Sequence, residues 1–338
     1  MNLVMVTSDP VIIEKILSSP ELLDKSKILY EPLYVALQGG IISSPAKEWY
    51  PHRKLINPSF NHKVIVSFLP IFHKAKKQIL SKFEALVGTD EQKLSEMILQ
   101  ATVGITINYT KNCLVTNLTT LLNYYLQLII SKLQRLQEIE TIRDHSKKDT
   151  SAKTDDSVLT IKKTPNIFID QAIQIYQKQQ FTWNDIIAES NTIVVSFETT
   201  SVAILSTLVM LAMHSDVQER LYEEILSVFP EKNFQMEYEH MEQLPYLDMV
   251  INETMRLMPS VPVIARQPGK DIQLTEDILL PKDIQIMISI FHLHRNTDIW
   301  GTNANKFNPD NFLPANLVGK HSHAFIPFSK GARNCIGR

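Results

Sequence analysis

The stretch "FIPFSKGARNCIGR" at residues 325–338 surrounds one cysteine, Cys335, with two glycines and an arginine. This is unusual in a chain of 338 residues that contains only two cysteines and nine glycines. Gly331 and Gly337 are expected to adopt positive φ and to let the backbone approach the sulfur closely. Arg333 lies two residues before the cysteine, where its charge favours the thiolate or pairs with an anionic group of a ligand. We therefore interpret Cys335 as a candidate metal thiolate.

The chemistry that suits such a thiolate is axial ligation of a haem iron, because the sulfur pushes electron density onto the iron and favours O–O cleavage. Phe328 is expected to form an apolar wall that keeps water from the sulfur. The alternative is a buried structural cysteine. However, the pattern Phe-x-x-Gly-x-Arg-x-Cys-x-Gly is expected by chance in a chain of this length with a probability on the order of 10⁻⁴ or less.

The second cysteine, Cys113, has no comparable surroundings, and two cysteines are too few for a disulfide framework. A zinc module built from His321, His323 and Cys335 is a further alternative. It would have only three ligands and no Cys-x-x-Cys pair, so it is the weaker interpretation.

Composition indicates a mainly α protein with minor β structure, since glycine is scarce and long stretches are rich in Leu, Ile, Lys, Glu and Gln. With 44% hydrophobic residues the chain can bury a large core. The net charge of -2 and the lack of a basic stripe interleaved with aromatics argue against nucleic acid as a partner. The first apolar run is too short for a signal peptide or an anchor.

The apolar spacing predicts a series of helices, the longest from Trp183 or Asn184 to about His214. Its second half is apolar, but only about 12 residues are unbroken by charge, whereas a membrane span needs ~20. We therefore expect a buried central helix. Residues 260–292 alternate like short strands, and the polar segment 144–165 is expected to be a loop inside a single domain, residues 1–338. Other helices are expected from Asp9 to about Leu17, over 63–87, 91–103, 118–142 and 241–258, and 296–334 is expected to be loop.

Several segments resemble the cytochrome P450 family of haem-thiolate monooxygenases. "FSKGARNCIG" matches every fixed position of the family's haem-binding loop, and "NETMRLMP" is similar to its Glu-x-x-Arg helix, in which Glu253 and Arg256 share a face. "LHRNTDIWG" and "FNPDNFLPAN" are similar to the segments that precede the cysteine loop. The resemblance covers nearly the whole chain, is best over 181–338, and in detail is to the microsomal fatty-acid-hydroxylase group of animals. It implies an incomplete cytochrome P450 fold with a long central helix and a small β region.

The resemblance implies haem b as cofactor, with its iron bound axially by Cys335. In the long helix it implies that Glu198 and Thr199, in "VSFETT", relay protons to dioxygen. The alternative is that Thr199 bonds its own helix and Glu198 is solvated. We favour the relay, because a glutamate in a buried helix needs a reason. The expected partners of the haem propionates are Arg333, Arg53 and Arg266, with Trp49 beside Arg53.

The implied function is insertion of one oxygen atom of O₂ into an apolar substrate such as a fatty acid, hormone or xenobiotic. Electrons would come from NADPH through NADPH-cytochrome P450 reductase, with cytochrome b5 as a further partner. A basic surface that includes Lys330 would dock the acidic reductase. The implied location is the cytosolic face of the endoplasmic reticulum membrane, the source of microsomes. The alternatives are a non-catalytic chain that binds haem weakly or not at all, and a haem-thiolate isomerase, against which the retained Thr199 speaks.

Some positions depart from the family pattern. Ser196 replaces the glycine that opens a notch for dioxygen, and Val195 replaces a glutamate that esterifies the haem, so we expect non-covalent binding. Asn311 replaces an arginine that completes a triad with the Glu-x-x-Arg pair, and we expect an incomplete, less stable ion-pair network. Pro51 is expected to place Trp49 outside its helix and thereby make its haem contact doubtful.

The resemblance also implies that the sequence is a fragment without the family's N-terminal membrane anchor and C-terminal end. The stretch 113–145 is expected to be shorter than the family's substrate-covering region.

Overall fold

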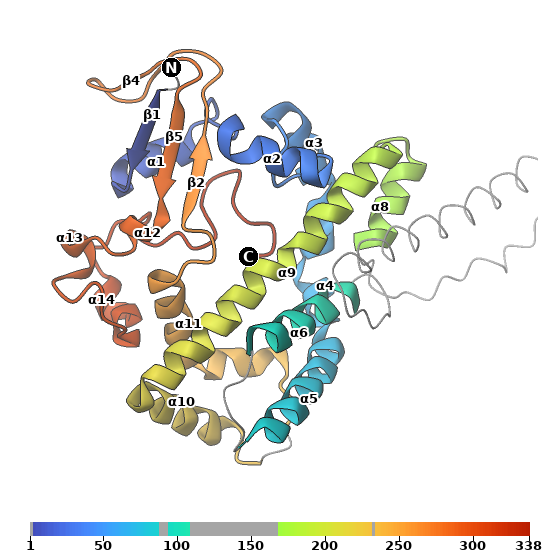
Figure 1. The fold of residues 1–338 in the computed structure, drawn as a ribbon, viewed down its shortest axis with the longest axis vertical. Coiled ribbons are helices and arrows are strands. Elements are labelled where there is room, and N and C mark those ends of the chain that lie inside the picture. The colour runs from blue at the N-terminus through green and yellow to red at the C-terminus, as the bar shows by residue number, and fades with distance from the viewer. Residues whose placement is uncertain (1–2, 88–93, 109–167, 232–233) are drawn as a thin grey trace, which may run out of the picture.

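A computed structural model describes residues 3–87, 94–108, 168–231 and 234–338. Helices make up most of this structure, and the strands gather at one end of it (Figure 1). The mainly α class with minor β structure is therefore confirmed. The expected helix at 118–142, the polar loop at 144–165 and Cys113 lie outside the described residues.

The β region consists of a three-stranded sheet and a short hairpin. The strands β2 to β5 lie within 260–292, as expected, whereas β1 near the amino terminus was not predicted. In the sheet the order is β1-β5-β2, with β1 parallel and β2 antiparallel to the central β5. Isoleucines from β5 and from the helix α1 that follows β1 form the core beneath it. The strands are β1 Val4–Thr7, β2 Val263–Arg266, β3 Ile272–Gln273, β4 Leu279–Leu280 and β5 Gln285–Ser289.

Helix α1, Pro10–Ser18, begins where the sequence predicts it. The Asp9 side chain accepts hydrogen bonds from the backbone N–H groups of Val11 and Ile12, which would otherwise lack partners. Pro10 has no N–H group, and at the first helical position such a group would have no partner within the helix.

Helix α9, Trp183–Met213, is the predicted long helix and runs through the middle of the structure (Figure 1). A capping box fixes its start: Thr182 N donates to Asp185 Oδ2 at 2.7 Å, and Asp185 N to Thr182 Oγ1 at 3.2 Å. By length and composition α9 is apolar enough to cross a membrane. Its first half is largely buried, whereas Val202, Ile204 and Met213 of the second half are exposed, so the expectation of a buried helix holds only for the first half. The helix packs against α6, α8, α10 and α11, which supports the interpretation as a central helix.

The expected helix over 63–87 is split into α4 His62–Val66 and α5 Leu69–Leu86, and the one over 91–103 corresponds to α6 Leu94–Asn108. The sequence analysis did not predict α2, α3, α8 and α10. The helix expected at 241–258 begins at Pro245, because proline suits a first helical position, and a 3₁₀ turn precedes it. The expected loop 296–334 contains three short helical turns. These elements are α2 Lys27–Leu37, α3 Ala46–Ile56, η1 Asn57–Phe60, α4 His62–Val66, α5 Leu69–Leu86, α6 Leu94–Asn108, α8 Phe168–Gln177, α10 Ser215–Val228, η2 Tyr238–Gln243, α11 Pro245–Leu257, α12 Ile290–Leu293, α13 Thr297–Trp300, η3 Pro309–Phe312 and α14 Pro314–Leu317.

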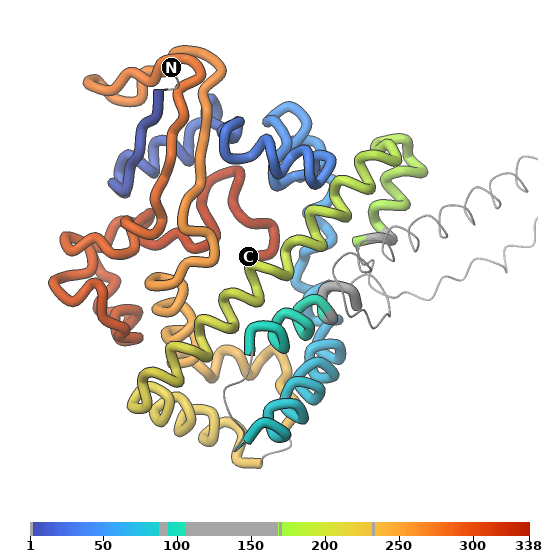
Figure 2. The backbone as a smooth tube through the Cα atoms, in the orientation of Figure 1, coloured from blue at the N-terminus to red at the C-terminus, as the bar shows by residue number. Residues whose placement is uncertain are grey.

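The carboxyl-terminal segment reaches the middle of α9 (Figure 2). There Ile336 packs against the cluster that contains Val194 and Phe197 of α9 and Trp49 of α3. The cysteine-containing loop therefore lies between the central helix and α3.

Candidate functional site

The loop that carries Cys335 is closed by its own backbone. The Cys335 N–H donates to the Phe328 carbonyl at 2.9 Å, and the Asn334 N–H donates to the Gly331 carbonyl at 3.2 Å. The Cys335 thiol is free and exposed, so it is accessible to a metal ion, and Phe328 is 38% exposed. The Phe328 carbonyl thus takes part in closing the loop, and its role as an apolar wall stays a prediction.

The two glycines of the loop differ. Gly331 has the expected positive φ of 73°, and a Cβ there would lie 2.0 Å from the Leu17 carbonyl oxygen, so only glycine fits against the end of α1. The expectation of a positive φ at Gly337 is wrong. A Cβ at Gly337 would lie 4.0 Å from Cys335 Sγ, so this glycine leaves open space beside the sulfur without an unusual backbone. Ser329 adopts φ 58° although it is not glycine, a strained conformation of a kind that clusters at functional sites.

Arg333 is a buried cation with few partners. It is 7% exposed; Nη2 donates to the Ser44 carbonyl at 2.5 Å, and the guanidinium carbon lies 4.7 Å from the centre of the Trp49 ring. Within the described residues, Nε and Nη1 are buried and have no hydrogen-bond partner. Burial, followed by the charge of Arg266, lowers the pKa of Arg333 to about 10.

Two further cations act on Arg333 or share its surroundings. Arg266, on β2, is 2% exposed, and its Nη1 donates to the Ala265 carbonyl at 3.0 Å. Lys25 precedes α2, donates to the Ile42 carbonyl, and was missed by the sequence analysis. Burial, followed by the charges of Arg266 and Arg333, lowers the pKa of Lys25 well below its usual value. We call Lys25, Arg266 and Arg333 the basic cluster.

The basic cluster lacks compensating charge. None of its members forms an ion pair with any residue in the part of the chain that the structure describes. Asp24 acts on Arg333 at longer range, but its carboxylate already accepts the Ala46 N–H at 2.6 Å. A group with two carboxylates would supply the missing partners.

Arg53 and Trp49 both lie on α3, beside the cysteine loop. Arg53 donates from Nη1 to the Asn334 carbonyl and from Nη2 to Asn334 Oδ1, each at 3.0 Å. The expectation that Pro51 places Trp49 outside the helix is wrong, because Trp49 is within α3 and only 4% exposed. Pro51 leaves the Lys47 carbonyl without its helical partner, but Lys47 is exposed, so water can bond that carbonyl.

The acid and the hydroxyl of α9 are arranged differently from the expectation. Thr199 Oγ1 donates to the Ser196 carbonyl at 3.2 Å, as in the alternative in which the threonine bonds its own helix. Glu198 is exposed in this structure, so the idea that it lies in a buried stretch is wrong for the described residues. Ser196 Oγ donates to the Ile193 carbonyl at 2.6 Å.

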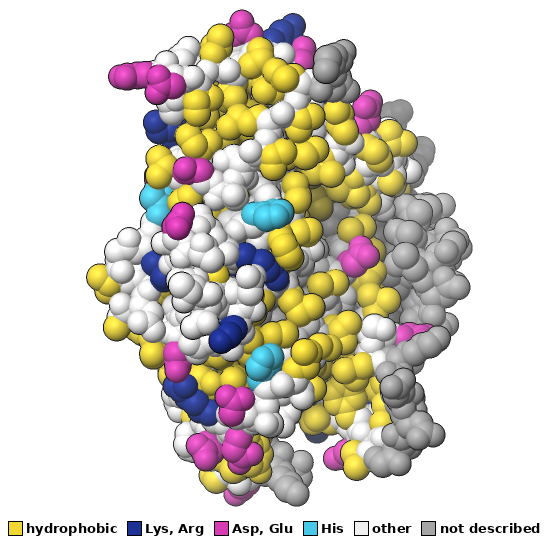
Figure 3. Space-filling model, turned by 60° about the vertical axis from the view of Figure 1, so that its left-hand side comes forward, with side chains coloured by type: hydrophobic (Ala, Val, Ile, Leu, Met, Phe, Trp, Pro, Cys, Tyr) yellow, Lys and Arg dark blue, Asp and Glu magenta, His cyan; other side chains and the backbone are white. Residues whose placement is uncertain are grey.

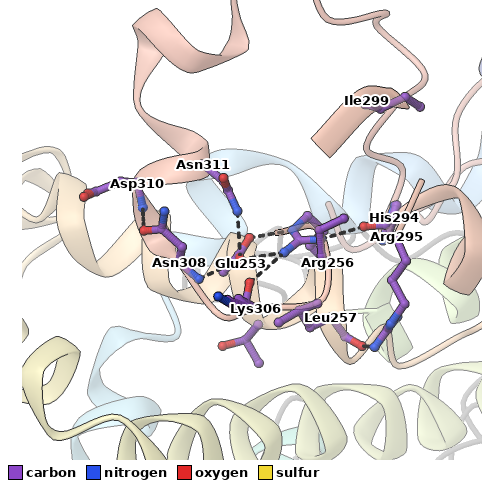
Figure 4. Close-up of polar contacts among 12 residues, drawn as sticks. Glu253, Arg256, Leu257, His294, Arg295, Ile299, Lys306, Asn308, Asp310 and Asn311 are labelled. Atoms are coloured by element: carbon purple, nitrogen blue, oxygen red, sulfur yellow. Dashed lines mark hydrogen bonds and ion pairs between the residues drawn. The ribbon is translucent and has the colours of Figure 1, made fainter. Parts of the chain in front are cut away.

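Glu253 and Arg256 form the predicted pair at the end of α11 (Figure 4). Both side chains are 0% exposed; Nε donates to Glu253 Oε2 at 2.6 Å and Nη2 to Oε1 at 2.7 Å. Arg256 also donates to the carbonyls of His294, Ala304 and Lys306, at 2.7, 2.6 and 3.2 Å. All five N–H donors of the guanidinium are therefore used.

Asn311 supplies no charge to this network, but the hydrogen bonds of the network are complete. Asn311 Nδ2 donates to Glu253 Oε1 at 3.0 Å, and the backbone N–H of Asn308 donates to the same oxygen at 2.9 Å (Figure 4). An arginine at position 311 would add a second cation to one carboxylate. With asparagine at this position, the charges of Glu253 and Arg256 cancel and all their hydrogen bonds are made.

The two histidines considered for zinc lie with Glu14 of α1, and Cys335 is not part of that group. His321 Nδ1 accepts the His323 N–H at 3.1 Å, so we assign the ring proton to Nε2, which lies 3.2 Å from Glu14 Oε2. A ring nitrogen that carries a proton cannot bind a metal. The interpretation as a zinc module with Cys335 is therefore not supported.

The sequence is similar to known proteins over most of its length. A sequence model described as Cytochrome P450 matches residues 83–338. "Probable cytochrome P450 313a4" of Drosophila melanogaster is 36% identical over an alignment that covers 98% of this chain and 74% of that protein. "Probable cytochrome P450 313a2" of the same organism is 34% identical over 99% and 74% of the two chains. "Cytochrome P450 4p1" of that organism is 26% identical over 96% and 70%.

Proposed function

The chain belongs to the cytochrome P450 family of haem monooxygenases, and on that premise we propose that Cys335 binds the iron of haem b and that the chain oxidises an apolar organic substrate. One oxygen atom of O₂ would be inserted into a fatty acid, hormone or xenobiotic. The observation that carries this proposal is the basic cluster, two buried arginines and a partly buried lysine without ion-pair partners among the described residues, near an exposed thiol.

Haem b fits this arrangement because it combines an iron that takes a thiolate with two propionates. Cys335 would hold the iron, and the unpaired Nε and Nη1 of Arg333 would donate to a propionate, with Arg266 and Lys25 adding charge. Val195 offers no carboxylate for an ester, so the haem is held non-covalently. When bound, the haem supplies the chemistry of oxygen activation.

Arg53 and Trp49 support the same site from α3. Arg53 holds the loop through Asn334, and the Trp49 ring covers one face of the Arg333 guanidinium. The Cys335 charge raises the pKa of Arg53 although burial, the larger effect, lowers it. Arg53 and Trp49 thus keep the Arg333 guanidinium and the Cys335 thiolate close together.

Proton delivery is proposed for Glu198 and Thr199. Thr199 Oγ1 donates its hydrogen to the Ser196 carbonyl, so in a relay this hydrogen would turn from the carbonyl to the proton acceptor while a lone pair of Oγ1 takes up the next proton from a neighbour. Glu198 is adjacent in sequence and exposed, so it can exchange protons with solvent. Asn311, Glu253 and Arg256 have a structural role in this proposal.

An apolar substrate suits the surface of the molecule. Figure 3 shows a hollowed face on which apolar side chains gather; most Lys, Arg and His side chains in this view lie to its left, and acidic side chains are scattered around it. We propose NADPH-cytochrome P450 reductase and cytochrome b5 as electron donors, with Lys330 of the cysteine loop in the docking surface. The proposed location is the cytosolic face of the endoplasmic reticulum membrane.

The deciding experiment is the spectrum of the haem-reconstituted chain, reduced under carbon monoxide. We expect a red-shifted, thiolate-type Soret band that is lost in Cys335→Ala and kept in Cys113→Ala, a control that removes the other cysteine. If no haem is retained, or if wild type and Cys335→Ala give the same band of a neutral ligand, the chain is the non-catalytic alternative.

A further inference from the structure

Helix α9 carries a fully buried carboxylate, Glu189, that has no role in the function proposed above. Its side chain is 0% exposed, Oε2 accepts the Ile41 N–H at 3.0 Å, and Oε1 lies 2.8 Å from His52 Nδ1. Burying a carboxylate costs several kcal/mol unless it is paired and hydrogen-bonded. Each of its two bonds leads to a different segment that contacts the cysteine loop.

The first connection runs through residues 39–44. Gly40 has φ +84°, and a Cβ there would lie 2.1 Å from Thr192 Oγ1 and 2.7 Å from the Ala188 carbonyl oxygen. This segment therefore sits directly on α9, where Glu189 holds the next residue, Ile41. The same segment ends at Ser44, whose carbonyl accepts the hydrogen bond from Arg333.

The second connection runs through α3. His52, bonded to Glu189, is followed by Arg53, whose guanidinium makes two hydrogen bonds to Asn334. Arg333 and Asn334 are the two residues that immediately precede Cys335. Both connections from Glu189 thus end on the two residues that set the position of the sulfur.

The charge of His52 strengthens the second connection. Burial alone would lower the pKa of His52, but the hydrogen bond and charge of Glu189, with the charges of Asp185 and Glu48, raise it above the usual value. Asp185 Oδ1 lies 3.7 Å from Nε2, and the Phe181 ring covers the imidazole at 4.6 Å between ring centres. A group whose pKa is raised on folding stabilises the folded state below its unfolded pKa, and this is lost as pH rises through the folded pKa.

We propose that Glu189, paired with His52, is a positioning residue that holds the cysteine loop for thiolate ligation of the haem. The ligation part of this inference rests on the proposed function. The positioning part does not, because both connections exist in the protein alone. It predicts energetic coupling between Glu189 and Asn334, which have no hydrogen bond to each other.

The first test is a double-mutant cycle on the unliganded chain, with Glu189→Gln, Asn334→Ala and the double variant in urea denaturation. We expect the combined effect on the unfolding equilibrium constant to differ from the product of the single effects by at least about threefold. His52→Gln replaces Glu189→Gln if the latter does not fold. The control is Glu21→Gln, which removes a carboxylate from an exposed ion pair with Lys270 and should show no coupling. Independent effects of Glu189 and Asn334 would overturn the proposal.

The second test uses the reconstituted haem protein and follows the thiolate-type fraction of the carbon monoxide spectrum from pH 6 to 9. In wild type this fraction should fall on the alkaline side, as His52 loses its proton, whereas protonation of the cysteine itself would lower it on the acid side. His52→Gln should give a lower fraction without the alkaline fall, and Glu21→Gln should behave as wild type. The same alkaline profile in His52→Gln would overturn the role in ligation. A wild type with no thiolate band at any pH would refute the proposed function, and the double-mutant cycle would still decide the positioning role.

Discussion

Arg256 and Arg333 are both buried arginines, and they differ in what surrounds them. Arg256 donates all five of its N–H groups to a glutamate and to backbone carbonyls. Arg333 donates one, and its Nε and Nη1 have no partner among the described residues. A buried cation that the protein satisfies completely serves the fold, whereas one left open indicates a place for an anion from outside the chain.

The difference has an energetic consequence. Burial, followed by the charge of Arg266, disfavours the cation of Arg333 more than Asp24 favours it, and this opposes folding of the unliganded chain. An anionic ligand that binds only the folded chain returns that free energy as binding. Mutation of Arg256 should therefore lower mainly the unfolding free energy of the chain. Mutation of Arg333 should lower mainly the affinity for the anionic ligand.

The largest effect is expected at the satisfied arginine. Arg256→Met leaves the Glu253 carboxylate buried without its cation and three carbonyls without donors. Such a change costs about 3–5 kcal/mol of unfolding free energy, measured by urea denaturation of the unliganded chain. The double variant Glu253→Gln with Arg256→Met should recover part of that loss, because the unpaired charge is gone. A loss below about 1 kcal/mol in the single variant would contradict the structural role.

A smaller effect on stability, and a clear one on binding, is expected at the open arginine. Arg333→Met keeps an apolar stem against Trp49 and removes a cation whose charge is uncompensated. The unfolding free energy of the unliganded chain should change by at most about 1 kcal/mol, while haem affinity falls at least about 10-fold, or about 1.4 kcal/mol. Urea denaturation and titration of the Soret band measure the two quantities. If Arg333→Met destabilises the unliganded chain as much as Arg256→Met, the contrast between the two arginines fails.

The parts of this structure that the sequence predicted are those set by neighbours in the chain. The Asp9 cap, the long α9 and the pairing of Glu253 with Arg256 follow from helical spacing, and the cysteine loop follows from a contiguous motif. Lys25 lies in no motif, and its place in the basic cluster arises because the fold brings β2 and the cysteine loop beside it. Such long-range proximity leaves no local pattern in the sequence.

At two other positions the outcome depended on the partner or solvent that the fold supplies. The missing arginine charge at Asn311 is replaced by an amide hydrogen bond to Glu253, and the broken helical bond at Pro51 falls on an exposed carbonyl. In both cases the effect of the residue type itself was predicted correctly. Its consequence depended on the neighbouring group, which is the Glu253 carboxylate for Asn311 and solvent for the Lys47 carbonyl opposite Pro51.

The smallest effect expected is a pH dependence that Lys25 imposes on the unliganded chain. Because the pKa of Lys25 is lowered on folding, the unfolded chain binds a proton that the folded chain does not, between the lowered pKa and 10.5. The unfolding free energy should therefore rise with pH across this window, by less than about 1.4 kcal/mol per pH unit.

Comparing the chain with Lys25→Met isolates this effect. Both proteins should carry Cys113→Ser and Cys335→Ser, so that no thiol titrates, and urea midpoints should be measured between pH 8 and 10.5. Methionine cannot take up a proton, so its midpoints should rise less steeply. Equal slopes would mean that Lys25 is not disfavoured as a cation in the folded chain. The basic cluster would then consist of Arg266 and Arg333 alone. Only these two cations would support the inference that an anion binds there.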